Sequence, residues 1–230
     1  MCPTLSRFAV NRFSSCQKNP LYFRCWLISR LRAASRGALF MDSNIFRELV
    51  EDALLQGNWT HLKDWISDHS SFTFDGETLP GDGTFDQGIF EEIIALLNRD
   101  SFLHSNGSSN VLLFFEYDWA ILTGEQRKQL LPAIVLAYPK LRDQFSWYVI
   151  SELLGRFFAD KGALDALHQL KSVADDNQRS LVPTGLERLI KNSNDPAVRE
   201  NAYNELKEMK NDPSDEVRQE VEFSLRQFGS

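Results

Sequence analysis

The chain has 230 residues, enough for one domain or two small ones, and its 43% hydrophobic content is sufficient to form a buried core. Its longest apolar runs, such as VLLFF at 111–115, are far shorter than the roughly 20 residues that span a bilayer, so we expect no membrane segment. Residues 41–230 hold all 32 acids and 18 of the 25 basic residues, a net charge of 18 − 32 = −14. Because proteins bind nucleic acids through Lys and Arg, this charge argues against a nucleic-acid ligand and favours a basic protein partner.

Residues 1–40 contain seven basic residues, no acid, and all three cysteines, Cys2, Cys16 and Cys25. An Arg-rich, Ser-rich and acid-free segment is typical of an organellar transit peptide. The alternative is that the folded protein begins at Met41, where the composition changes abruptly, and that residues 1–40 are disordered, cleaved or outside the fold. We favour this alternative and a cytoplasmic location, which the lack of cysteine in residues 41–230 also fits.

Residues 41–122 are predicted to form a helical N-terminal region. The first helix follows Asp42 or Ser43, either of which can cap it, and a second amphipathic segment begins near Trp59. The Gly-, Asp- and Ser-rich stretch 70–88 is predicted to be a loop. A third helix is expected over 88–100, a loop over 101–110 and a fourth, mostly buried helix over 111–122.

Residues 123–230 are predicted to form helices near 124–138, 143–158, 161–174, 178–191, 195–210 and 214–228. Asp195 and Pro196 suit the cap and first position of one helix, and residues 212–214 offer similar chemistry to the next. Both helices continue with Val-Arg and carry an apolar stripe with the same spacing. These stripes are Val198, Ala202, Leu206 and Met209, then Val217, Val221, Leu225 and Phe228.

A longer period links these helices into pairs. Glu152, Glu187 and Glu222 are 35 residues apart, and Glu116 precedes Glu152 by 36. A repeat of about 35 residues that holds two helices indicates an α-solenoid, in which each hairpin buries its apolar face on its neighbours.

The segment DPSDEVRQEVEFSLRQFG at 212–229 resembles the Asp-Pro-x-x-Val-Arg helix of HEAT-like repeats, the type also found in phycobilisome lyases, and DPAVRENAYNELKEM resembles it more loosely. The resemblance covers about residues 123–229. It implies a right-handed α-α superhelix of HEAT-like hairpins over 123–230, with residues 41–122 as an N-terminal helical cap. The aromatic residues at 147–148 and 157–158 depart from the family pattern.

No catalytic constellation is evident in the sequence. None of the four histidines has a second His or Cys at metal-ligand spacing, and His61 beside Asp64 is typical of an ordinary surface pair. The loop DGETLPGDGTFD lacks the regular order of an EF-hand, so we interpret it as a solvated loop rather than a calcium site. Phosphate-binding and nucleophile-elbow motifs are absent. We therefore predict no metal and no cofactor, and we favour a protein that is not an enzyme over one that is.

The repeated glutamates are the candidate binding surface. Residues one period apart in a solenoid stack along one wall, and stacked like charges repel unless a positive group binds them. Tyr and Trp beside acids are good interface anchors, but Trp147 repeats at valines and is predicted to be core. The predicted partner-binding residues are Glu116, Tyr117, Asp118, Tyr148, Glu152, Glu187 and Glu222. The alternative is that the glutamates form a solvated surface without a role in binding.

Two classes of function remain open. The first is a non-enzymatic binding protein with an acidic surface, and its specific form is an immunity protein that neutralises a basic toxin. The second, which the resemblance to phycobilisome lyases implies, is an enzyme or chaperone that holds a small ligand or cofactor near Trp119, Tyr148 and Glu152. Base-repair enzymes built on HEAT-like repeats require a basic groove, which the charge argues against.

Overall fold

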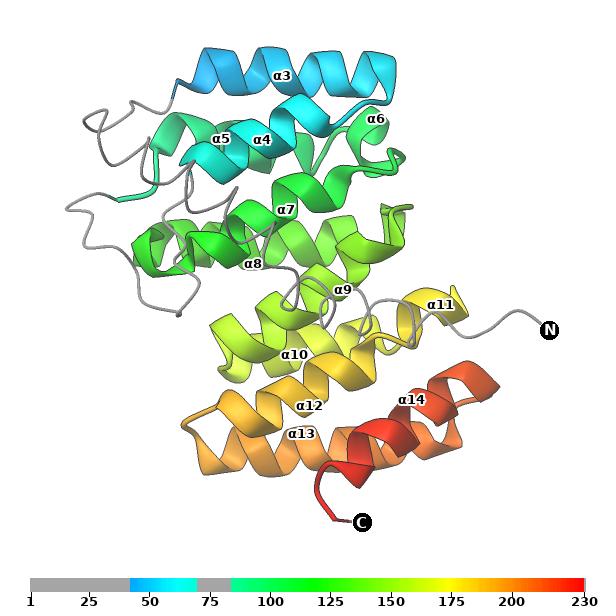
Figure 1. The fold of residues 1–230 in the computed structure, drawn as a ribbon. Helices are drawn as coiled ribbons and strands as arrows, with labels where there is room; N and C mark the ends of the chain where they lie inside the picture. Colours follow the sequence, from blue (N-terminus) through cyan, green and yellow to red (C-terminus); the bar gives the residue numbers. More distant parts are fainter. Residues whose placement is uncertain (1–41, 70–83, 230) are drawn as a thin grey trace, which may run out of the picture. The chain divides into compact units, whose positions relative to one another are not determined.

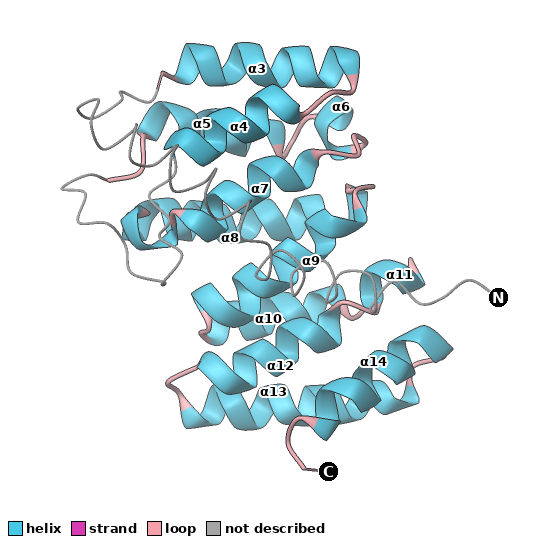
Figure 2. Ribbon diagram, viewed as in Figure 1, coloured by secondary structure: helices cyan, strands magenta, loops and turns pink. Residues whose placement is uncertain are grey.

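The computed structural model describes residues 42–69 and 84–229, and within these ranges helices are the only regular elements (Figure 1). Figure 2 shows short connections between successive helices and no strand in the described part. The all-α prediction is therefore confirmed for these residues. Residues 1–40 and most of the predicted 70–88 loop lie outside the described ranges.

Four of the N-terminal helices were predicted from the sequence, with different bounds, and a fifth, the short α6, was not. They are α3 Ser43–Gln56, α4 Thr60–His69, α5 Gln87–Leu96, α6 Asp100–Leu103 and α7 Ser108–Tyr117, followed by a 3₁₀ turn, η1, at Trp119–Ile121. Asp42 caps α3 by accepting a hydrogen bond from the amide of Asn44 (2.8 Å).

The loop predicted over 101–110 is wrong, because α6 and the start of α7 fall within it. Ser108 and Ser109 are buried at the start of α7. The Ser109 amide donates to the Asp143 carboxylate (2.9 Å), and the Ser108 hydroxyl bonds that of Ser146 (2.8 Å). These polar residues are satisfied by a segment more than 30 residues away, which local composition does not reveal.

The C-terminal helices follow the predicted rhythm closely. They are α8 Gly124–Ala137, η2 Tyr138–Lys140, α9 Gln144–Glu152, η3 Leu153–Phe158, α10 Lys161–Leu170, α11 Asp176–Arg179, α12 Val182–Asn192, α13 Pro196–Glu208, η4 Met209–Asn211 and α14 Asp215–Arg226. The predicted helix over 178–191 was placed too early, because Gln178 and Arg179 belong to the short α11. Gln178 is held there by its amide nitrogen, which donates to the carbonyl of Leu141 (3.2 Å).

One continuous core extends from Phe46 to Leu225, and helices before and after residue 122 contribute to it. The first predicted stripe is confirmed, since Val198, Ala202 and Leu206 are buried on α13 and Met209 on the following η4. The second is confirmed for Val217, Val221 and Leu225 on α14, whereas Phe228, beyond the end of that helix, is half-buried. Both helices pack against α12, which also packs against α10 and the η3 segment. Each helix therefore buries one face against neighbours that are close in sequence.

The two Asp-Pro starts use different chemistry. Asp195 caps α13 as predicted, since its carboxylate accepts from the Ala197 amide (2.8 Å) and Pro196 occupies the first helical turn. At α14 the cap residue is Ser214, whose side chain makes no cap hydrogen bond. Asp212 instead accepts from the Ser214 amide (2.9 Å), so its carboxylate shapes the turn before the helix.

The same kind of side-chain to backbone hydrogen bond closes four of the turns between helices. A side-chain nitrogen donates to the backbone carbonyl six residues earlier in four places: Trp147 to Leu141 (3.0 Å), Arg179 to Val173 (2.7 Å), Arg199 to Ser193 (2.9 Å) and Arg218 to Asp212 (2.5 Å). The arginines of both Val-Arg pairs are thus used to close turns. Trp147 is buried, which confirms its prediction as a core residue.

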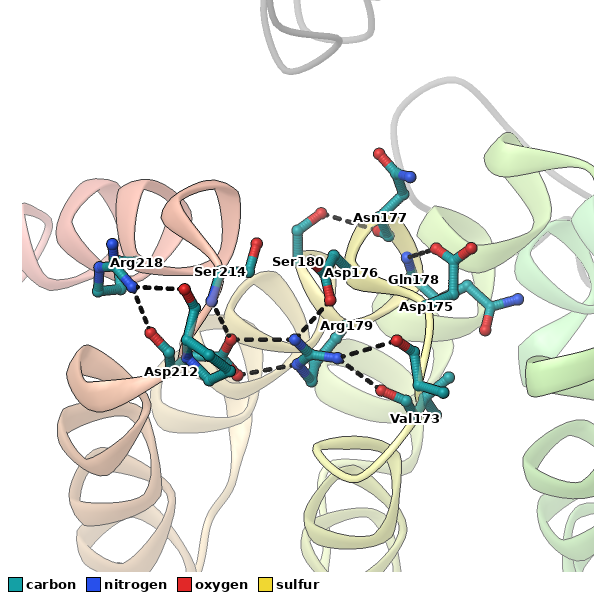
Figure 3. Close-up of polar contacts among 12 residues, drawn as sticks. Val173, Asp175, Asp176, Asn177, Gln178, Arg179, Ser180, Asp212, Ser214 and Arg218 are labelled. Carbon is teal, nitrogen blue, oxygen red and sulfur yellow. Dashed lines mark hydrogen bonds and ion pairs between the residues drawn. The ribbon is translucent and has the colours of Figure 1, made fainter.

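Arg179 makes the most extensive of these contacts (Figure 3). Its side chain is 9% exposed and donates to both carboxylate oxygens of Asp212 (2.8 and 3.1 Å) and to Asp176 (2.7 Å). The bond and charge of Asp212 raise the pKa of Arg179. Burial acts to raise the pKa of Asp212, but the hydrogen bonds from Arg179 and the Ser214 amide, together with the charges of Arg179 and Arg218, outweigh it and the net shift is downward. The pair joins the turn after α13 to α11, 33 residues apart.

We predict that Arg179→Ala lowers the free energy of unfolding by about 2 kcal/mol or more, because it leaves the Asp212 carboxylate without its main partner. Arg218→Ala is the matched control. It also removes a turn-closing arginine, but one whose side chain is 38% exposed, so we expect a loss below about 1 kcal/mol. Urea denaturation measures both variants, and equal losses would contradict the role given to the buried pair.

Candidate functional site

The helix that begins as α9 changes its winding at Leu153. Residues Leu153–Phe158 form a π-helix, the only one in the described part of the chain. It ends at Ala159, whose φ of 47° makes it the one described non-glycine residue with a positive φ. Both features cost energy and concentrate at functional sites, so they direct attention to this segment.

Two glycines set how closely the π-helix and α12 approach. A Cβ added at Gly155 would overlap the carbonyl oxygen of Gly185 and lie 2.6 Å from the Cβ of Arg188. A Cβ at Gly185 would lie 2.6 Å from Leu167 and 3.3 Å from the Ser151 carbonyl oxygen. The two helices therefore cross in backbone contact, which brings Arg188 of α12 to the side of α9.

Arg188 pairs with two of the predicted glutamates. Its Nε donates to Glu152 Oε1 (2.7 Å), and its Nη1 lies 3.8 Å from Glu187 Oε1. Glu187 also accepts from Lys191 (2.5 Å) one turn along α12. Burial acts to lower the pKa of Arg188, but the hydrogen bond and charge of Glu152 outweigh it and raise that pKa. Glu152 and Glu187 are buried, and internal cations neutralise both.

Glu116 differs from these two glutamates. It lies half-buried near the end of α7, and within the described residues it forms no hydrogen bond or ion pair. Burial raises its pKa to about 7, the Glu152 carboxylate adds to the rise, and Arg156 opposes it. Arg156 is exposed and stands over the Phe157 ring (5.1 Å). Glu116 is therefore a carboxylate whose charge the fold compensates poorly.

Two tyrosines are close enough to respond to these carboxylates. Burial raises the pKa of Tyr148 to about 12; Glu152 adds to the rise, and Arg188 opposes it. Burial and the Glu116 charge raise the pKa of Tyr117 to about 12. Tyr148 is half-buried and stacks on Phe145 with ring centroids 5.7 Å apart.

The predicted site residues do not form one continuous acidic strip. Glu116, Tyr117, Tyr148, Glu152 and Glu187 influence one another across α7, α9 and α12, and we call these five with Arg188 the glutamate cluster. Asp118 is fully buried, so the expectation that it faces a partner is wrong. Glu222 is exposed on α14 and lies 3.8 Å from Arg226 of its own helix. Of the predicted glutamates, Glu152 is paired with Arg188 and Glu187 with Lys191.

Sequence reasoning missed the residues that organise the cluster, namely Gly155, Gly185, Arg156 and Arg188. The available signal was glycine inside two helical patterns, which is costly unless a close approach requires it. An aromatic group lies beside the cluster: Trp119 packs on Phe158 (4.7 Å) and lies under Arg127 (4.8 Å). Trp119 therefore lies at the edge of the core.

The minor candidates gain no support. His61 and Asp64 are both exposed on α4. No group of three or more potential metal ligands occurs in the residues that the structure describes. The calcium candidate, 75–86, lies mostly outside them. None of the described helices has the length and apolar character needed to cross a membrane.

Comparison of the chain with protein-family models, curated proteins and solved structures gave no match. The resemblance to HEAT-like repeats therefore stays a prediction from the sequence.

We predict that Glu116→Gln stabilises the protein at about pH 8 and has little effect at about pH 5. The folded pKa of about 7 exceeds the ordinary value of 4.5, so the stability that this group contributes is present below pH 4.5 and is lost as pH rises through 7. The gain should be about 2 kcal/mol, allowing for partial exposure. Urea denaturation at both pH values measures it, with exposed Glu222→Gln as the control that should show no gain.

We also predict that Gly155→Ala destabilises the fold by about 2 kcal/mol or more, because the new methyl group overlaps the backbone of Gly185. Gly124→Ala is the control. A Cβ at Gly124, in the first turn of α8, meets nothing within 4 Å, so the melting temperature should be unchanged or slightly higher. An unaffected Gly155→Ala variant would mean that the helices do not cross in backbone contact.

Proposed function

We propose that the protein is a non-enzymatic, protein-binding α-solenoid whose glutamate cluster receives a cationic group from a basic partner. In this proposal the helical hairpins stack as HEAT-like repeats in a right-handed superhelix, with residues 41–122 as the cap. The packing of α12 on α10, α13 and α14, together with the 35-residue period, supports this stacking.

One observation carries the proposal. The charge of Glu116 is poorly compensated, whereas the charges of Glu152 and Glu187, which occupy equivalent positions in the next two repeats, are neutralised. Glu152 and Glu187 each have a cation within 2.7 Å, whereas Glu116 has no ion pair among the described residues. A half-buried carboxylate without a partner costs stability that a bound cation would restore. The charge of −14 over residues 41–230 would draw a basic protein toward the surface.

Neutralisation of a basic toxin is the specific form of this proposal. A protein that acts by covering a cationic surface needs acids and aromatic anchors but no catalytic group, and Tyr148 beside Glu152 supplies such an anchor. The excess of negative charge on residues 41–230 supports this form of the proposal. The substitution at Glu116 described below tests it.

A second candidate function is binding of a small ligand, with or without catalysis. A carboxyl group with a pKa of about 7 is suited to proton transfer at neutral pH. The half-buried aromatic residues Trp119, Phe157 and Phe158 lie on the adjoining segment. A thermal-shift screen with tetrapyrroles and common cofactors distinguishes this candidate from protein binding. A rise in melting temperature that depends on the ligand and is abolished by Glu116→Gln would favour small-ligand binding.

For the main proposal, we predict that Glu116→Lys weakens binding of a short labelled peptide of alternating lysine and arginine by about tenfold or more at low salt. Glu222→Lys is the matched control, because it changes the net charge equally at an exposed position of the same repeat series. Fluorescence anisotropy measures both. Equal weakening in the two variants would show that net charge, and not the glutamate cluster, governs the binding.

A further inference from the structure

The repeat period allows the cation environments of successive glutamates to be compared directly. Glu116, Glu152, Glu187 and Glu222 occupy equivalent positions, and the residues that follow them are Tyr117, Leu153, Arg188 and Phe223. Arg188 is the only cation in that second series. It reaches back one period to Glu152, so one junction between repeats carries a built-in guanidinium.

The Arg188 junction shows how a guanidinium fits between these helices. Arg188 touches the carboxylate of Glu152 on one side and approaches that of Glu187 on the other, with side-chain exposure of 36%. The hydroxyl of Tyr148 lies close enough for the Arg188 charge to oppose the rise in the pKa of Tyr148 that burial causes. A half-exposed arginine is thus held between two carboxylates and beside a tyrosine.

The preceding junction, at Glu116, also contains a glutamate but lacks an arginine at the position equivalent to Arg188. The position equivalent to Arg188 is Leu153, which is fully buried and brings no charge to Glu116. The cation that acts on Glu116 is Arg156, which is exposed and makes no ion pair within the described residues. Glu152 and Tyr148 both interact electrostatically with Glu116, so the groups that flank Arg188 also border this junction.

We propose that the partner inserts an arginine side chain at Glu116, where it repeats the contacts that Arg188 makes at Glu152 one period later. The inference rests on the proposed function and specifies the chemistry of the partner. The occupied junction supplies the template, and the buried Leu153 explains why the equivalent position in the described residues brings no cation to Glu116.

Arginine fits this junction better than lysine. Its planar fork places several donors in fixed directions and can bridge two carboxylates, as Arg188 does with Glu152 and Glu187. An ammonium group is a compact, strongly hydrated point charge that satisfies one carboxylate at a time. The half-buried Glu116 offers its two carboxylate oxygens to an incoming fork, and the charge of Glu152 nearby adds to the attraction.

The test compares two labelled peptides of equal length and charge, one of arginine and one of lysine, with the full chain at about pH 8 and low salt. Under these conditions Glu116 is ionised and charge attraction is weakly screened. Fluorescence anisotropy should show about tenfold tighter binding of the arginine peptide. Glu116→Gln should reduce this preference below about twofold, whereas Glu222→Gln should leave it intact.

Each outcome decides between the two proposals. If both peptides bind equally to the unmodified chain and Glu116→Gln weakens both, the cluster binds cations without preference and the arginine inference is overturned while the proposed function stands. If neither peptide depends on Glu116, both proposals fail. If the arginine preference survives Glu116→Gln, the arginine binds elsewhere and the inference is likewise overturned.

Discussion

The crossing of Gly155 and Gly185 is the contact on which the rest of the site depends. Backbone touches backbone there, and this distance places Arg188 beside Glu152 and lets Arg188 approach Glu187. Gly155 lies inside the π-helix, which ends at the left-handed Ala159. A side chain at either glycine would separate the helices, and the arrangement of charges between them would be lost.

Charge balance inside the fold explains why a strongly acidic chain holds together. The buried carboxylates of Glu152, Glu187 and Asp212 each face a cation supplied by a neighbouring segment or helical turn. These pairs offset the burial of the acids without adding apolar area. Glu116 stands outside this balance, so its poorly compensated charge is a local property of one junction and not of the acidic composition as a whole.

The sequence predicted the helices, both apolar stripes and the 35-residue period, because these depend on spacing along the chain. It misplaced the start of α12 and missed α6, since Gln178, Ser108 and Ser109 are held by partners 34 to 40 residues away. It also grouped Glu222 with the site because of the period, and Asp118 because it lies near Glu116 in the sequence. Which acids are buried, and which cation meets them, follows from helix crossings that no local pattern encodes.

The turn-closing contacts have a consequence for the way the chain folds. Arg179, Arg199 and Arg218 each reach a carbonyl six residues away, so every one of these turns can close before distant segments meet. The contacts that join successive hairpins, such as Arg179 to Asp212, span only 33 residues. The turns are therefore expected to form early in folding, and the links between segments 33 residues apart to follow as the helices pack.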